Sequence, residues 1–293
     1  MINNGATKHD IVTCANNSSL FPPLLREIPL PPARLYLKGM LDFGRPHVAI
    51  VGTRRATAAG KETARALARD LARANVVVVS GLAFGIDAAA HEGALEGGGA
   101  TVAVLPTSLD RIYPRHHQGL AELILAQNGA LISEYAAGTP SYEGNFLARN
   151  RIISGLSLGV IIIEAPQISG ALATARFALE QNRDVFVIPG PISHPNYVGS
   201  HRLIQQGAML ITSAHDALEA LGIASPLTGD AESDAALTID QKKIIAIVRE
   251  AGAPMDVDTV AEQSGLAIEV VSGALAALTV AGLIKERGGL YEL

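Results

Sequence analysis

The sequence predicts an α/β protein, with a doubly wound, Rossmann-like parallel sheet followed by a small C-terminal winged-helix domain. Two observations lead to this prediction. From about residue 47, short runs rich in Val and Ile alternate with Ala/Leu-rich segments of helical length, as in "HVAIVGT" and then "AAGKETARALARDLARA". From residue 238 onward, the pattern changes to three amphipathic segments and a short hairpin.

Seven apolar runs are expected to form the sheet. Unbroken apolar strands between amphipathic helices are typical of parallel strands covered on both faces. The connections between them should be right-handed crossovers. The seven runs are "HVAIVGT", "NVVVVSG", "ATVAVLPT", "ALISEY", "LGVIIIEAP", "DVFVIPG" and "AMLITS".

The composition divides the chain into four regions. The first 20 residues are polar and are expected to form a loose tail, and "FPPLLREIPLPPARLYLKG" is expected to dock on the core as an extended segment. The small, polar stretch "IASPLTGDAESDAAL" is typical of a linker. In the last region, "LTIDQKKIIAIVREAG", "DVDTVAEQSG" and "AIEVVSGALAALTVAG" should be helices, and "LIKERGGLYEL" a wing that turns at Gly288 and Gly289. The predicted regions are residues 1–20 (tail), 21–222 (Rossmann-like), 223–237 (linker) and 238–293 (winged helix).

Bulk charge and cysteine content limit the possible functions. The formal net charge is −5, so a nucleic-acid site must be a local basic patch. Cys14 is the one cysteine, there is no signal-peptide pattern, and no apolar run could span a bilayer, so we expect a cytoplasmic protein without a membrane partner. The histidines show no metal-ligand spacing, and we predict no metal.

Polar residues follow several of the predicted strands, at the edge where ligands bind to parallel sheets. Gly52-Thr53-Arg54-Arg55 precedes a helix, where amide groups, the helix dipole and a guanidinium can bind a phosphate. The alternative is that the two arginines only solvate a turn. Ser169-Gly170 opens another helix with the same anion-binding potential. The motif G-x-G-x-x-G and the P-loop lysine are absent, so neither NAD nor ATP is predicted.

Asp87 and His91 lie four residues apart and should share one face of a helix. They could form an acid/base pair. A hydrogen bond that braces the pocket is the favoured interpretation, because no nucleophile or second carboxylate is evident nearby.

The stretch "NFLARNRIISGLS" combines an aromatic ring with two arginines. Single-strand binding needs cations for phosphates and aromatic faces for bases, and Phe146 with Arg149 and Arg151 provides both. The alternative is that Phe146 anchors the core and one arginine pairs with Glu143 or Glu164. Helical residues two apart point about 200° apart, so the two arginines should have different roles.

The predicted winged helix is acidic. Residues 238–293 contain five basic and eight acidic residues, and "AIEVVSGALAALTVAG" has no Lys, Arg, Asn or Gln. Reading duplex DNA requires those side chains. We therefore expect this domain to contact protein or to be regulatory. The same acidic charge argues against a transcription regulator that binds DNA through the winged helix.

These motifs together resemble the DprA/Smf family, from about Phe21 to Leu221. The resemblance rests on "PPARLYLKG", "VAIVGTRR", "VVSGLAFGIDAAAH", "LDRIYP", "NGALISEY", "NFLARNRIISGLS", "VIIIEAPQISGALATARFAL", "VFVIPGP" and "LIQQGAMLI" in that order, and many members also carry the winged helix. The helical domain that precedes this region in many members has no counterpart here, so a short form is expected.

The resemblance implies a single-stranded DNA-binding recombination mediator of natural transformation, which protects the strand and loads the RecA recombinase. It implies self-association through the Rossmann-like domain, no catalysis and no cofactor. The DNA pocket it implies uses Gly52, Thr53 and Arg54 together with Phe146, Arg149, Asn150 and Arg151. With the strand-end residues, the predicted DNA-binding set is Gly52, Thr53, Arg54, Arg55, Phe146, Arg149, Asn150, Arg151, Ser169 and Gly170. Leu147 replaces the family's proline, and Glu143 and Gly144 stand where a lysine is common.

A second interpretation is enzymatic. Phosphoribohydrolases of the lysine-decarboxylase-like type have a related fold and a P-G-G-x-G-T-x-x-E motif whose glutamate does the chemistry. The corresponding stretch, "IEAPQISGALATA", lacks that glutamate.

Overall fold

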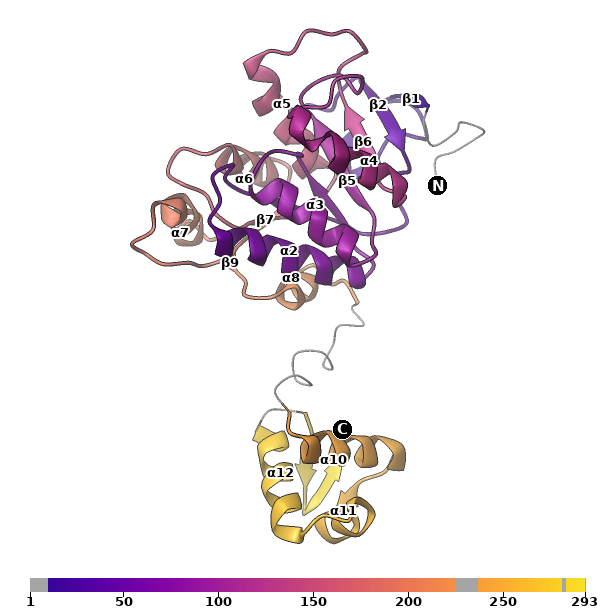
Figure 1. Cartoon of the computed structure of the whole chain (residues 1–293), viewed down its shortest axis with the longest axis vertical. Coiled ribbons are helices and arrows are strands. Elements are labelled where there is room, and N and C mark those ends of the chain that lie inside the picture. Colours follow the sequence, from indigo (N-terminus) through magenta and orange to yellow (C-terminus); the bar gives the residue numbers. More distant parts are fainter. Residues whose placement is uncertain (1–9, 225–236, 281–282, 293) are drawn as a thin grey trace. The chain divides into compact units, whose positions relative to one another are not determined.

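The computed structural model describes residues 10–224, 237–280 and 283–292, which belong to two compact units, Met1–Pro226 and Leu227–Leu293 (Figure 1). The division falls inside the predicted linker, of which residues 225–236 lie outside the described residues, as do residues 1–9 of the leading segment. Each unit has its own hydrophobic core.

The first unit is built on a nine-stranded sheet with the order β1-β2-β6-β5-β4-β3-β7-β8-β9. The last seven strands in this order, β6-β5-β4-β3-β7-β8-β9, are parallel to one another. They confirm the seven strands predicted from the sequence. They are β3 (His47–Val51), β4 (Val77–Ser80), β5 (Thr101–Leu105), β6 (Ala130–Ser133), β7 (Gly159–Ile162), β8 (Asp184–Val187) and β9 (Met209–Leu210).

Two antiparallel strands extend one edge of this sheet. β1 (Ile11–Ala15) pairs with β2 (Arg34–Gly39), and β2 pairs with β6. Residues 11–15 were expected to lie in a loose tail, and the structure corrects this: Cys14 is buried and packs in the same core as Leu35. The strand is short and flanked by polar residues, so its own pattern does not indicate a partner.

Helices cover both faces of the sheet. One layer contains α2 (Ala58–Arg73), α3 (Ile86–Glu96), α4 (Gln118–Ala126) and α8 (Ala214–Ala220). In Figure 1, α2 and α3 lie side by side in front of the strands, and their approach needs Gly93, where a Cβ would lie 2.1 Å from the carbonyl oxygen of Arg65. The other layer contains α1 (Pro23–Arg26), α5 (Glu143–Gly155), α6 (Gly170–Glu180) and α7 (Val198–Gln205).

The strand order reverses between β3 and β7. Successive crossovers run from β3 toward β6, whereas those after β7 run toward β9 on the other side. The loops that leave the carboxyl ends of β3 and β7 therefore diverge and leave a crevice. In open α/β sheets, this is where ligands bind.

The second unit confirms the predicted winged helix. Its helices are α10 (Ile239–Ala251), α11 (Val257–Ser264) and α12 (Ile268–Val280). A three-stranded sheet combines β10 (Met255–Asp256), β12 (Leu290–Glu292) and β11 (Lys285–Arg287). Gly288 and Gly289 make the predicted turn, with φ of +62° and +81°. Within the described residues, no helix is long and apolar enough to cross a membrane.

Candidate nucleic-acid interface

An open cleft of about 1760 Å³ lies at the carboxyl ends of the strands. It exceeds the roughly 300–1,000 Å³ of a small-molecule pocket, and such a volume suits a polymer. Within the part of the chain that the structure describes, five arginines and three carboxylates line it, an excess of two positive charges in a chain of net charge −5. The charged lining residues are Arg54, Arg55, Arg111, Arg115, Arg149, Asp87, Asp110 and Glu143.

The loop after β3 brings Gly52, Thr53, Arg54 and Arg55 to the cleft, as predicted from the sequence. The anion site expected at the start of α2 is, however, already filled by the protein. The carboxylate of Glu164 accepts hydrogen bonds from the backbone amide of Thr57 (3.1 Å) and from its hydroxyl (2.5 Å) at the N-cap of this helix. In this loop, the exposed guanidinium groups of Arg54 and Arg55 are thus the parts left to bind an external anion.

Glu164 ties three loops together from a fully buried position. Besides Thr57, it accepts hydrogen bonds from Asn196 Nδ2 (2.8 Å) and from the Tyr197 hydroxyl (3.2 Å), which follow β8. Burial favours the protonated acid, but the hydrogen bonds from Thr57, Asn196 and Tyr197 outweigh it and hold the pKa of Glu164 below its ordinary value of 4.5. The alternative in which Glu164 pairs with an arginine of α5 is therefore wrong.

We expect Glu164→Gln to lower the free energy of unfolding by about 3 kcal/mol at neutral pH, because charged hydrogen bonds are lost and an amide donor then faces other donors. A carboxyl with a lowered folded-state pKa stabilises the fold above its unfolded pKa and loses this contribution as the pH falls through the folded pKa. The difference between wild type and variant should therefore shrink below about pH 4.5. Urea unfolding followed by circular dichroism at several pH values measures it. Glu180→Gln, at an exposed position on α6, is the control, and equal stability of Glu164→Gln and wild type at pH 7 would contradict the role.

The start of α6 faces the cleft, as predicted. Ser169 is its N-cap and accepts a hydrogen bond from the amide of Ala171 (3.2 Å), and Gly170 is exposed. Asn150 Nδ2 donates to the carbonyl of Gly170 (3.1 Å), which fixes this helix start against α5. Ser169, Gly170 and Asn150 all line the cleft.

Phe146 lies in the first turn of α5 and is half-buried in the cleft. The guanidinium carbon of Arg54 lies 5.2 Å from the centre of its ring, within cation–π distance. Tyr113 meets the same ring edge-on, with 5.1 Å between the ring centres. A ring on α5, a cation from the loop after β3 and a second ring from the loop after β5 therefore come together at one point.

Arg149 lines the cleft but is only 5% exposed. Its Nη1 donates to the carbonyl of Gly81 (2.6 Å) and to that of Val104. Burial lowers its pKa to about 10, so it stays charged at neutral pH. Arg149 thus clamps α5 onto the ends of β4 and β5, and it shapes the cleft more than it offers a free cation.

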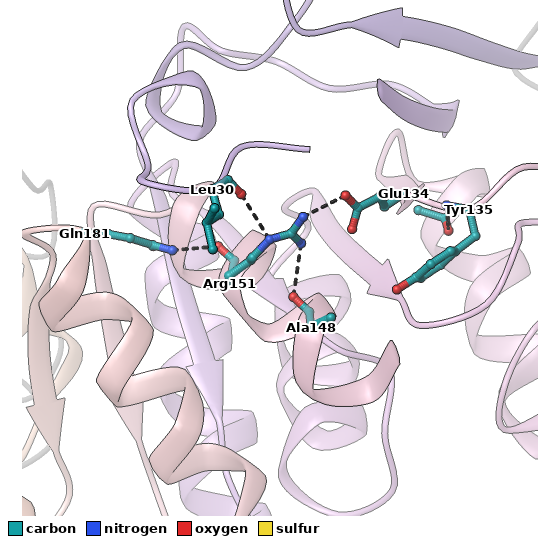
Figure 2. Close-up of polar contacts among 7 residues, drawn as sticks. Leu30, Glu134, Tyr135, Ala148, Arg151 and Gln181 are labelled. Atoms are coloured by element: carbon teal, nitrogen blue, oxygen red, sulfur yellow. Dashed lines mark hydrogen bonds and ion pairs between the residues drawn. The ribbon is translucent and has the colours of Figure 1, made fainter. Parts of the chain in front are cut away.

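Arg151 is not among the residues that line the cleft. Figure 2 shows its guanidinium turned toward Glu134 (Nη2 to Oε1, 2.6 Å), with further hydrogen bonds to the carbonyls of Leu30 and Ala148. The prediction that the two arginines have different roles is confirmed. Of the predicted DNA-binding set, Arg151 is a residue that the structure does not bring to the cleft, because the helix turns this side chain toward Glu134 after β6. Its carboxylate partner is neither Glu143 nor Glu164.

Asp87 and His91 do not pair with each other. Asp87 accepts hydrogen bonds from the amides of Gly81 (3.1 Å) and Ala83 (3.4 Å) and so braces the loop after β4. His91 Nδ1 donates to the hydroxyl of Thr101 (2.7 Å), which itself donates to the carbonyl of Val78. Burial lowers the pKa of His91 to about 3, so this ring is neutral and structural. The bracing interpretation is confirmed for Asp87.

Sequence reasoning missed the contribution of the loop after β5. This loop places Arg111, Tyr113 and Arg115 on the cleft, and all three are exposed. The stretch "LDRIYP" contains the first two, but neither it nor Arg115 was assigned a contact. Leu147 and Glu143, the two departures from the family pattern, also line the cleft and are exposed.

Comparison with known proteins gives two family matches along the chain. The profile of DNA recombination-mediator protein A matches residues 12–222, and that of the DprA winged helix domain matches residues 228–289. Protein Smf of Escherichia coli is 40% identical over 283 residues, 94% of this chain and 75% of that protein. DNA processing protein DprA of Bacillus subtilis is 42% identical over 214 residues, 72% of this chain and 71% of that protein.

Solved structures agree with these matches. DNA processing protein A of Streptococcus pneumoniae is 41% identical with a TM-score of 0.67, covering 71% of this chain and 74% of that one. DNA processing protein A of Helicobacter pylori, described for its single-stranded DNA binding mode, is 35% identical with a TM-score of 0.64, covering 73% and 96%. The resemblance found in the motifs is confirmed, and the chain belongs to the DNA recombination-mediator protein A family, that of the DprA and Smf proteins.

Proposed function

We propose that the cleft binds single-stranded DNA and that the protein is a recombination mediator, which protects incoming strands and loads the RecA recombinase onto them during transformation. The observation that carries the proposal is the meeting of Arg54, Phe146 and Tyr113 inside a basic cleft. Single-strand sites combine a cationic groove with rings on which bases stack. The single-stranded DNA binding mode described for the Helicobacter pylori relative supports the same assignment.

The charges around the cleft favour a phosphate backbone as the ligand. Among the described residues, Arg54, Arg55, Arg111 and Arg115 are exposed, and no carboxylate lies within ion-pair distance of them. Their guanidinium groups are therefore available to phosphates, which they can bind bidentately. Arg111 and Arg115 add positive charge to a cleft in which Glu143 stands where the family resemblance implies a lysine.

Binding to oligo(dT) tests the proposal. We expect fluorescence anisotropy to show binding that weakens with added salt, and preference for the single strand over a duplex of the same length. Phe146→Ala should weaken binding by about 1–3 kcal/mol, the contribution of one stacked base. Ile192→Ala, which removes an exposed apolar side chain outside the cleft lining, is the control. If Phe146→Ala bound with full affinity, Phe146 would not stack on a base and would instead be a residue that anchors the core.

Recombinase loading and self-association are further parts of the proposal. Stimulation of strand exchange by the cognate recombinase tests recombinase loading. If the protein bound DNA but did not stimulate strand exchange, the proposed role would be limited to protecting the strand.

A homodimer formed by the first unit is supported by the sheet edge at β9, where Met209 and Leu210 are 48% and 45% exposed. Sedimentation velocity tests it, and a monomer at micromolar concentration would contradict it.

We further propose that the protein acts in the cytoplasm and without catalysis. The enzymatic alternative, a nucleotide phosphoribohydrolase, needs a glutamate that reaches the substrate. Glu164, which follows β7, is fully buried under four hydrogen bonds, and this supports the non-catalytic assignment. Release of free base from nucleoside monophosphates would overturn it.

A further inference from the structure

An aromatic surface lies next to the cleft, outside the residues that line it. Phe84, in the loop after β4, is 45% exposed. Its ring packs against His117 with 4.7 Å between centres and lies 6.0 Å from the ring of His116, which is exposed. We call Phe84, His116 and His117 the Phe84 platform.

The loop that carries Phe84 is held in an unfavourable backbone conformation. Leu82 has φ of +57°, a region that a leucine rarely occupies. Three side chains from different elements fix this loop: Asp87 accepts from Gly81 and Ala83, Arg149 donates to Gly81, and His117 Nδ1 bonds to the carbonyl of Leu82 (2.8 Å). The ring of Phe84 is therefore presented outward from a rigid support, which limits the conformational entropy lost when a ligand stacks on it.

The platform continues the ring series of the cleft. Phe84, Tyr113 and Phe146 together line a small pocket of about 30 Å³, and Arg54 and Arg149 lie in its wall. Among the residues that the structure describes, no carboxylate lines this pocket. The three rings and the two arginines thus share one pocket that joins Phe146 and Tyr113 to Phe84. The exposed Arg115 precedes His116 in the chain.

We propose that the Phe84 platform is a second base-stacking subsite, which takes a nucleotide of the same single strand where it leaves the cleft. This inference rests on the proposed function. Every base has a π-face, so stacking on Phe84 requires no particular sequence. The face of Phe84 provides the contact, and His116 borders it. The platform lengthens the binding site without changing the chemistry of the cleft.

Binding to oligo(dT) of increasing length, from about 4 to about 16 nucleotides, tests the subsite, because single-strand sites vary over this range. We expect Phe84→Ala to weaken binding of the long oligonucleotides about tenfold and to leave the shortest unchanged. Phe84→Trp should keep the affinity, because a ring remains. The control is Leu123→Ala, which truncates an exposed apolar side chain elsewhere, on α4. This variant should bind like the wild type at every oligonucleotide length.

A second measurement reads stacking directly. A 2-aminopurine placed at successive positions of the oligonucleotide should be quenched at two separate places in wild type, and Phe84→Ala should remove one of them while Phe146→Ala removes the other. Equal weakening at all lengths, or unchanged quenching in Phe84→Ala, would overturn the subsite and leave the cleft proposal standing. If the wild-type protein bound no oligo(dT), the proposed function and the subsite would both fail.

Discussion

Arg149→Met should lower the free energy of unfolding of the first unit by about 3–5 kcal/mol, the effect of removing one member of a buried charged network. Arg149 is 5% exposed and donates to the carbonyls of Gly81 and Val104. The substitution leaves these oxygens without that donor. It also removes a positive charge near Asp87. Burial raises the pKa of this carboxyl above its ordinary value, and the charge of Arg149 opposes that rise. Urea unfolding without DNA, followed by circular dichroism, measures the effect.

The control is Arg176→Met, which makes the same change at an exposed position on α6 and should be close to neutral. Measured without DNA, the difference between the two variants separates folding from binding. If Arg149→Met were as stable as wild type, Arg149 would not be needed to hold α5 against β4 and β5. The role that the family resemblance gives it would then be direct contact with the DNA strand.

The sheet and the winged helix could be predicted from the sequence because their signals are local. Runs such as "GVIIIEAP" are buried on both faces and look alike in any parallel sheet. The Gly288-Gly289 turn needs left-handed backbone, and two glycines indicate it directly. β1 was missed because its five residues gain their stability from pairing with β2, about twenty residues later in the chain.

The candidate site could be predicted only in part, because its geometry depends on residues far apart in the sequence. The motif that contains Arg54 indicates a cation at a strand end, but it does not show that Glu164, more than a hundred residues later, fills the nearby helix N-terminus. Helical spacing separates the roles of Arg149 and Arg151, but it does not show which of them reaches the cleft. That depends on Glu134 of the neighbouring loop, which binds Arg151.

Arg54→Ala should raise the dissociation constant for oligo(dT) about tenfold or more, because it removes a phosphate contact from the cleft. Arg54 is exposed and lies over the ring of Phe146, where a phosphate and a stacked base can be bound together. If one phosphate contact is lost, the salt dependence of log K should become shallower by about 0.7. Anisotropy titrations at several salt concentrations measure both quantities. Arg34→Ala, an exposed arginine on β2 outside the cleft lining, is the control, and unchanged affinity of Arg54→Ala would rule out this site.

A double-mutant cycle with Phe146→Ala then shows whether Arg54 acts only on phosphate. If its contribution were purely electrostatic, the two losses would add, as they do for independent sites. The guanidinium lies 5.2 Å from the ring centre, so we expect it also to hold the ring in place for stacking. The double variant should therefore lose less binding free energy than the sum of the single variants. Arg54→Lys should fall between wild type and Arg54→Ala, because an ammonium keeps the charge but loses the planar stack and the bidentate phosphate contact.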